Sequence, residues 1–218
     1  WVRPHFTFYG YRYVKVEGNT QPLEKADYQA AVLYSDMTTT GAIKTANKKV
    51  NRLFQNILWG QKSNFLDIPT DCPQRDERLG WTGDAAVFSK TAALNMNVFS
   101  FSKKYAKDVA VEQKKYDGMV PMYAPAMGNT DGGAAVWGDA ATIIPWTMYQ
   151  SYGDPAILQQ NFSAMKDWVE WIGRNSKSND LWTGTFQFGD WLALDGENPA
   201  LPTGKTEEDF IASVYYFY

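Results

Sequence analysis

The sequence predicts a mainly helical domain that follows a short β region. Near the N-terminus apolar residues alternate with polar ones, which is the period of a strand. From Asn47 onward the apolar spacing becomes helical, and successive helix pairs joined by long glycine-rich connections suit an α/α toroid. We therefore expect residues 1–40 to end a β-sandwich domain and residues 41–218 to form the N-terminal part of the helical domain.

Two strands are predicted before residue 40. Aromatic residues alternate with polar ones across residues 6–16, and Gly10 interrupts the alternation, which suggests a bulge. A second strand is predicted for residues 28–35, with Ala30, Val32 and Tyr34 on one face. Because two strands cannot bury a core alone, we expect them to be the last strands of an antiparallel β-sandwich.

The first two predicted helices begin after polar residues. One follows Asn47 and the other follows Asp84, which is expected to cap a helix that reaches Phe101. The apolar spacing of the first helix fits one buried face, formed by Val50, Leu53, Phe54, Ile57 and Leu58.

Three further helix starts are predicted. Asp139 precedes a helix that should end near Tyr152 and Gly153, and Asp139 itself is explained equally well as a cap of that helix. Asp154 and Pro155 then form the usual start of the next helix. The run TEED from Thr206 resembles a capping box before the last helix.

The composition excludes several classes of protein. The formal net charge is −3 and no basic stripe occurs, so we do not expect a nucleic-acid partner. A single Cys and a single His exclude an internal disulfide and a His/Cys metal cluster, and no metal is expected. No apolar run approaches the ~20 residues that cross a bilayer, so no membrane partner is expected.

Two further expectations come from the ends of the chain and from its aromatic content. The N-terminus has no signal-peptide layout and the C-terminus stops within an apolar segment, so we expect both ends to be cuts inside a longer protein. Aromatic residues make up 16% of the chain, with nine Trp, which suits either a packed core or a sugar-binding surface.

The loop over residues 71–84 (DCPQRDERLGWTGD) is the strongest candidate for chemistry. Its prolines and glycines indicate an irregular loop that places Asp71, Glu77 and Asp84 near Arg75, with Trp81 as a platform. Crowded carboxylates and guanidiniums shift pKa values apart, which is how acid and base roles arise at neutral pH. A structural ion-pair network would have the same spacing, and spacing alone does not separate the two interpretations.

Two other loops also place an aromatic residue beside Gly-Asp. They are residues 136–139 (VWGD), with Trp137, and residues 188–191 (FGDW), with Trp191. Each sets an indole near a carboxylate at a glycine that lets backbone approach closely. The three loops could converge on one pocket, although core packing would explain each Trp and helix capping each Asp.

The long motif at residues 71–84 resembles the signature of the bacterial α-L-rhamnosidases of glycoside hydrolase family 78. Residues 6–14 (FTFYGYRYV) look like the end of that family's β-sandwich. Three more stretches look like landmarks of its catalytic domain: 56–61 (NILWGQ), 137–140 (WGDA) and 189–193 (GDWLA). The resemblance covers nearly the whole chain. It implies an (α/α)6 barrel and hydrolysis of terminal α-L-rhamnosides with inversion.

The resemblance also implies roles for individual residues. Glu77 matches the general acid, and the residues that match the sugar site are Asp71, Arg75, Trp81, Asp84, Trp137 and, by its local string only, Trp191. The family's base is a later Glu without a convincing counterpart here; the glutamates available near the C-terminus are Glu197, Glu207 and Glu208.

The resemblance implies no cofactor. The expected partners are a rhamnose-containing glycoside or polysaccharide, and the remainder of the parent chain or a second copy. Two alternatives stay open: a related inverting hydrolase for another sugar, and a base-lacking fragment that only binds carbohydrate or is purely structural.

Overall fold

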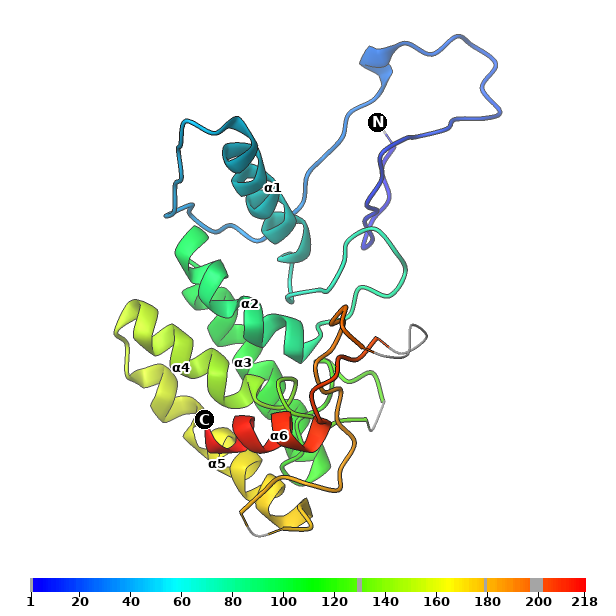
Figure 1. The fold of residues 1–218 in the computed structure, drawn as a ribbon. Helices are drawn as coiled ribbons and strands as arrows, with labels where there is room; N and C mark the ends of the chain where they lie inside the picture. The colour runs from blue at the N-terminus through cyan, green and yellow to red at the C-terminus, as the bar shows by residue number, and fades with distance from the viewer. Residues whose placement is uncertain (1, 129–130, 179, 197–201) are drawn as a thin grey trace.

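Helices dominate the computed structural model, which describes residues 2–128, 131–178, 180–196 and 202–218 (Figure 1). Two short 3-10 helices, Lys25–Asp27 and Lys114–Tyr116, accompany the α-helices. The α-helices in these ranges are α1 (Lys48–Asn64), α2 (Thr82–Asn95), α3 (Phe99–Gln113), α4 (Ala140–Tyr152), α5 (Ala156–Asn175) and α6 (Glu208–Phe217). None of the described helices is both long and apolar enough to span a membrane.

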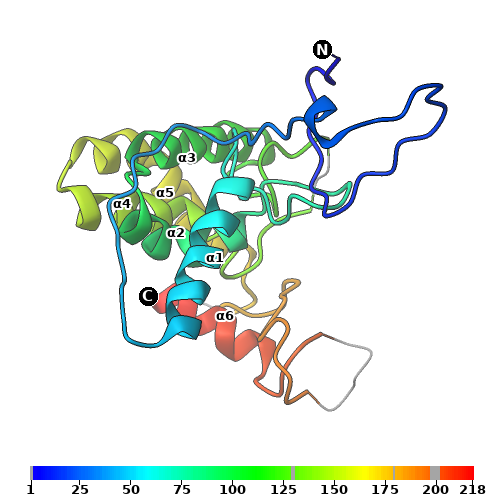
Figure 2. The same cartoon turned by 90° about the horizontal axis from the view of Figure 1, so that it is seen from above.

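Helices α2 to α5 form the packed part of the molecule, with α4 in contact with α2, α3 and α5 (Figure 2). Helix α6 joins the same core through the buried Ala212. Burial of large apolar side chains is the main stabilising contribution here. The largest fully buried apolar side chains of this core are Met96, Val98, Tyr105, Val109, Val120, Met148, Ile157, Trp168, Ile172 and Trp182.

Helix α1 begins where the sequence predicts. The Asn47 side chain accepts hydrogen bonds from the backbone N–H groups of Lys49 and Val50, at 2.9 and 3.4 Å, and so caps the helix. Of the predicted apolar face only Phe54 is buried, whereas Val50 and Leu53 are exposed. Helix α1 therefore presents much of its apolar face to the surface of this chain.

Helices α4 and α5 also confirm the sequence prediction. Helix α4 ends at Tyr152, and Gly153 takes the left-handed conformation (φ 73°) that commonly ends a helix. The Asp154 carboxylate accepts a hydrogen bond from the N–H of Ala156 at 2.9 Å, but the N-cap is Pro155, one residue later than predicted. The helix itself begins at Ala156.

The long helix predicted from Asp84 to Phe101 is wrong. Helix α2 begins two residues earlier, so Asp84 lies in its first turn, and α2 ends at Asn95 before α3 starts at Phe99. The interruption has a tertiary cause. Met96 is extended and bridges to Thr39, and the N–H of Asn97 donates to the carbonyl of Thr38 at 2.8 Å.

Two other predicted caps are not formed. Helix α6 begins at Glu208 without a side-chain cap, so the capping box expected at Thr206 is absent. Asp139 precedes α4 as predicted, but its carboxylate is turned to other donors and does not cap the helix.

The strands predicted for residues 6–16 and 28–35 are also not formed. Within the described residues only isolated bridges occur, and none involves these two segments. They belong to a wide loop that extends away from the helices (Figure 1). A strand is stable only when an adjacent strand satisfies its backbone along its length. Among the described residues neither segment pairs with another strand, although the N–H of Ser35 donates to the carbonyl of Phe65 and the carbonyl of Phe8 accepts from Arg78. Gly10 is accordingly not a bulge.

Candidate functional site

The acid-containing loop over residues 71–84 follows α1, includes the first turn of α2 and is anchored at its base. Asp71 and Leu79 close the loop through two hydrogen bonds. The N–H of Asp71 donates to the carbonyl of Leu79, and the N–H of Leu79 donates to Oδ1 of Asp71, each at 3.1 Å. The Gly80 carbonyl accepts hydrogen bonds from the Tyr105 hydroxyl of α3, at 2.7 Å, and from the N–H of Ala124, at 2.9 Å. These contacts fix the base of the loop to the helical core.

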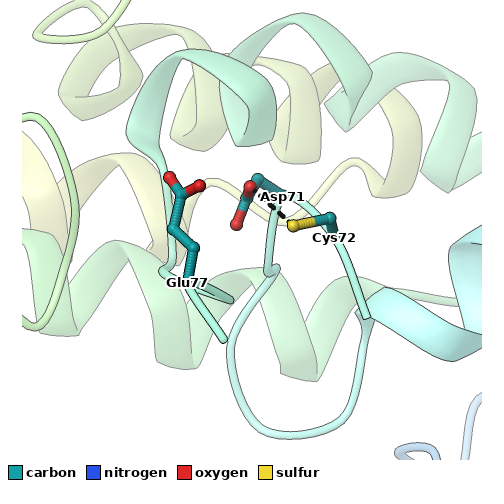
Figure 3. Close-up of side chains that lie close together, drawn as sticks. All are labelled: Asp71, Cys72 and Glu77. Atoms are coloured by element: carbon teal, nitrogen blue, oxygen red, sulfur yellow. Dashed lines mark hydrogen bonds between the residues drawn. The ribbon is translucent and has the colours of Figure 1, made fainter. Parts of the chain in front are cut away.

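Arg75 joins the two principal carboxylates of this loop. Its Nη2 lies 3.2 Å from Oδ2 of Asp71 and 2.7 Å from Oε2 of Glu77. The other Glu77 oxygen, Oε1, accepts a hydrogen bond from the indole N–H of Trp81 at 2.8 Å. Figure 3 shows Glu77 and Asp71 on opposite sides of the loop with their carboxylates turned toward each other. The structure therefore assembles four of the predicted residues into one cluster.

Cys72 completes the cluster. Its buried thiol donates to Oδ2 of Asp71 at 3.0 Å (Figure 3) and accepts from Nε of Arg75 at 2.9 Å. Burial, together with the bond to Asp71, raises the pKa of Cys72, so the group is a thiol at neutral pH. The ligand atoms of Asp71, Cys72 and Glu77 lie within 4.8 Å of one another, a grouping that could hold a cation. Arg75 contacts all three, and its positive charge offsets part of the negative charge of the two carboxylates.

Asp84 lies apart from this ion-pair network. Partial burial of its carboxyl raises its pKa, the charges of Asp71 and Glu77 raise it further, and a hydrogen bond from its own backbone amide opposes the change. The residue nevertheless keeps an exposed edge. The loop was expected to place Asp84 near Arg75, but the two do not pair among the ion pairs of the described chain, because Arg75 is engaged with Asp71 and Glu77.

The three aromatic loops meet in a second cluster beside the first. Trp137 lies 4.1 Å from Phe188 and 6.5 Å from Trp191, measured between ring centroids. Trp81 contacts Tyr123 with its ring edge, at 5.3 Å, and packs against the same group. Trp81 therefore belongs to both clusters, since its N–H binds Glu77 and its ring joins the aromatic group.

A strained turn holds Trp137 in place. Val136 has a φ of 69°, a left-handed conformation that β-branched residues rarely adopt. Its N–H donates to Oδ2 of Asp139 at 2.7 Å, and Oδ1 of the same carboxylate accepts from the Trp168 indole at 2.8 Å. Burial raises the pKa of Asp139 to about 6. Asp139 thus fixes the turn that presents Trp137.

A hollow of about 350 Å³ lies where the loops meet, and a second of about 400 Å³ adjoins it between α1 and α2. Asp84 and Val87 line both, so the two hollows share an edge. The walls of the first include Trp137, Trp191, Asp190 and Tyr215. Within the described residues, the buried indole N–H of Trp137 has no hydrogen-bond partner.

Sequence reasoning missed several residues of this region. Phe188 and Asp190 belong to a motif that it singled out, so they could have been found, whereas Tyr123 and Tyr215 carry no local signal. Of the glutamates weighed as a base, Glu197 lies outside the described residues. Glu207 and Glu208 are exposed at the start of α6.

Carboxylates beside an aromatic wall on a helical scaffold form the kind of site that binds a carbohydrate. The sequence model of the bacterial alpha-L-rhamnosidase six-hairpin glycosidase domain matches residues 38–218. The chain belongs to this family, and its helices are those of an α/α toroid, as the sequence predicted.

Proteins named alpha-L-rhamnosidase share much of this sequence. One from Alteromonas sp. (strain LOR) is 39% identical over 217 residues, or 98% of this chain and 23% of the relative. One from Streptomyces avermitilis is 38% identical over 213 residues, or 98% of this chain and 20% of the relative. The chain therefore spans less than a quarter of the length of these relatives.

Solved structures agree with the sequence comparison. The native enzyme from Aspergillus terreus superposes with a TM-score of 0.77 at 38% identity, over 84% of this chain and 21% of that one. The Streptomyces avermitilis alpha-L-rhamnosidase complexed with L-rhamnose gives a TM-score of 0.75, also at 38% identity, over 84% of this chain and 17% of that one.

Proposed function

We propose that this chain supplies the acid side of an active site that hydrolyses terminal α-L-rhamnosides with inversion. The observation that carries the proposal is the contact of Glu77 with Arg75 and Trp81, beside a hollow walled by Trp137 and Trp191. The relatives named alpha-L-rhamnosidase, one of them solved with L-rhamnose, support the choice of sugar.

Glu77 is the proposed general acid, which protonates the glycosidic oxygen as the bond to the anomeric carbon breaks. Arg75 and Trp81 orient its carboxyl group from two sides. Oε1 of Glu77 accepts the Trp81 hydrogen bond and Oε2 forms the ion pair with Arg75, and each carboxyl oxygen keeps a second position at which it can hold the proton that passes to the substrate. Trp81 and Arg75 are thus part of the reaction geometry.

Asp71 and Asp84 are proposed to bind sugar hydroxyls and to stabilise the positive charge that develops on the ring. Asp84 suits this role by position, since it lines both hollows. L-rhamnose is a 6-deoxy sugar, so its methyl group needs an apolar wall. Trp137 and Trp191 provide such a wall.

Inversion also requires a base that activates water on the opposite face of the sugar, with the two carboxyl groups about 6.5–9.5 Å apart. We expect this base in the part of the relatives that the chain does not span. No cofactor enters the proposed reaction.

The test is Glu77→Gln in the complete protein. Because the amide cannot donate the required proton, hydrolysis of an alkyl rhamnoside should fall at least ~100-fold. An activated nitrophenyl rhamnoside, whose leaving group needs little protonation, should suffer less. Proton NMR of the first turnovers should show β-L-rhamnose as the initial product. A nearly normal rate on the alkyl rhamnoside would remove Glu77 from the role.

The matched control is Asp76→Asn, which removes the same charge from the adjacent, exposed position. Its rates should stay within about twofold of the unmodified protein, since replacing an exposed surface side chain usually has a small effect. A panel of other nitrophenyl glycosides tests the rival substrate, because a better substrate among them would displace rhamnose.

A further inference from the structure

The N-terminal segment touches the acid-containing loop at a specific place. All residues from 2 to 34 are exposed except Phe8, which is half-buried. The ring of Phe8 lies under the guanidinium of Arg78, with 4.6 Å between the guanidinium carbon and the ring centroid. Arg78 Nη1 also donates to the Phe8 carbonyl at 2.5 Å. A cation over a ring face combined with a backbone bond defines one geometry.

A second contact lies two residues further along. A Cβ added at Gly10 would stand 2.7 Å from the carbonyl oxygen of Pro73 and 2.8 Å from the Cα of Gln74. The backbones therefore approach more closely there than any side chain would allow. Residues 8–10 thus contact both ends of the stretch 73–78. In Figures 1 and 2 the N-terminal part of the segment runs beside this loop.

The stretch 73–78 is the part of the loop that needs an external contact. Its base is fixed to the core through Asp71, Leu79 and Gly80, but Arg78 has a φ of 50°, a conformation that a non-glycine residue keeps only when its surroundings impose it. Arg78 directly follows Glu77. Any relaxation of Arg78 therefore turns the backbone that carries the proposed acid.

We infer that Phe8 is a positioning residue, which holds Arg78 and thereby the orientation of Glu77. The N-terminal segment that carries Phe8 therefore belongs to this site. This role goes beyond the proposed function. It rests on that function only in its effect on catalysis, because the contact itself can be tested in the chain without any substrate.

The chain contains its own reporter of loop order. Cys72 is the single cysteine, and it lies buried in the loop, bound to Asp71 and Arg75. Its alkylation by iodoacetamide requires the loop to open, so the rate reports how often the loop leaves this arrangement. In the 218-residue chain at constant pH, Phe8→Ala should raise that rate about three- to tenfold, the scale of a lost cation–π contact plus buried ring surface.

Three further variants test whether the change in alkylation rate comes from the contact between the N-terminal segment and the loop. Phe8→Tyr keeps the ring face and should restore the original rate. Tyr9→Ala removes an exposed aromatic ring from the neighbouring position and should change nothing. Gly10→Ala, which forces the segment off Pro73, should act like Phe8→Ala although the Phe8 ring is retained. Circular dichroism of each variant establishes that the helices are intact.

In the complete protein, Phe8→Ala should lower kcat on the alkyl rhamnoside about tenfold and leave KM within about twofold, because misorientation of the acid affects the chemical step. An alkylation rate unchanged by Phe8→Ala and by Gly10→Ala overturns the inference. If alkylation accelerates but the unmodified complete protein fails to hydrolyse rhamnosides, the proposed function falls and the positioning contact stands.

Discussion

Trp81 makes two different contacts, one through its indole N–H and one through its ring. Its indole N–H binds Oε1 of Glu77, and its ring packs against Tyr123 in the aromatic cluster. The position of the aromatic wall therefore affects the orientation of Glu77 through Trp81. A phenylalanine at this position would keep the wall and lose the bond, so the two tasks are separable in principle.

Asp139 is a buried carboxylate whose ionisation opposes folding. Its pKa is about 6 in the folded protein, compared with 3.8 for an unperturbed aspartate. Because the folded state holds the proton more tightly, the contribution of this group to stability is complete below about pH 3.8 and is lost as the pH rises through 6. The loss is on the order of 3 kcal/mol at most.

We predict that Asp139→Asn removes this part of the pH dependence. The free energy of unfolding, measured in urea at several values from pH 4 to pH 7, should decline with pH in the unmodified chain and decline less in the variant. The amide can accept only one of the hydrogen bonds from Val136 and Trp168, so the variant should also be less stable at pH 4. Equal slopes for the two proteins would show that the carboxylate does not ionise in this range.

Helices α1 and α2 each contain a glycine, and the two glycines have opposite surroundings. A Cβ at Gly83, in the first turn of α2, would lie 2.7 Å from the indole carbons of Trp137. A Cβ at Gly60, near the end of α1, would meet nothing within 4 Å. The intrinsic preference of a helix for alanine over glycine is the same in both, about 1 kcal/mol.

We predict opposite effects of the same substitution at these two positions. Gly60→Ala should stabilise the chain by about 0.5–1 kcal/mol, since only the helix preference acts. Gly83→Ala should destabilise it by about 1–3 kcal/mol, because overpacking against Trp137 outweighs that preference. Urea denaturation measures both. Destabilisation by Gly60→Ala, or stabilisation by Gly83→Ala, would contradict this account of the packing.

The helices that could be predicted from the sequence are those with local start and stop signals. Asn47 and Asp154 accept backbone hydrogen bonds within their own first turns, and Gly153 ends α4, so their neighbours in sequence are sufficient information. The break between α2 and α3 depends on Thr38, almost sixty residues away, which bonds to Asn97. No local pattern contains that contact.

For the candidate site too, the local motifs could be predicted from the sequence, whereas the contacts between distant parts of the molecule could not. The loops carrying Trp81, Trp137 and Trp191 could be selected by composition, and their meeting in space agrees with that selection. The contacts that fix them could not be predicted. Tyr105 binds the Gly80 carbonyl and Phe8 binds Arg78 across the fold, and neither residue has an unusual sequence context.

The exposed apolar surface of the described residues is the feature that most affects the behaviour of this chain in solution. Large apolar side chains stay exposed on α5 and α6, with Phe162 at 65%, Phe210 at 64% and Phe217 at 94% of full exposure. Trp146 and Val169 line a hollow of about 450 Å³ together with the last residues of α6. Exposed apolar side chains of this size favour association with another protein surface.

We predict that the 218-residue chain alone does not turn over rhamnosides and that it associates with itself. An inverting enzyme forms no covalent intermediate, so it cannot replace a missing base by a nucleophile. On the proposed function the chain carries the acid side only, and the apolar faces of α5 and α6 find no cover within one copy. Analytical ultracentrifugation should show a sedimentation coefficient that rises with concentration. Calorimetry should still detect binding of L-rhamnose at the Trp137 wall, and a nitrophenyl rhamnoside should stay intact.

Adding the remaining C-terminal part of a complete relative should dissociate the self-associated chain and restore hydrolysis, because it brings both the base and the missing cover. Inverting hydrolysis by the purified chain would contradict this argument and would place the base among its own carboxylates, with Asp84 and Asp190 in the shared hollow as the first to be replaced.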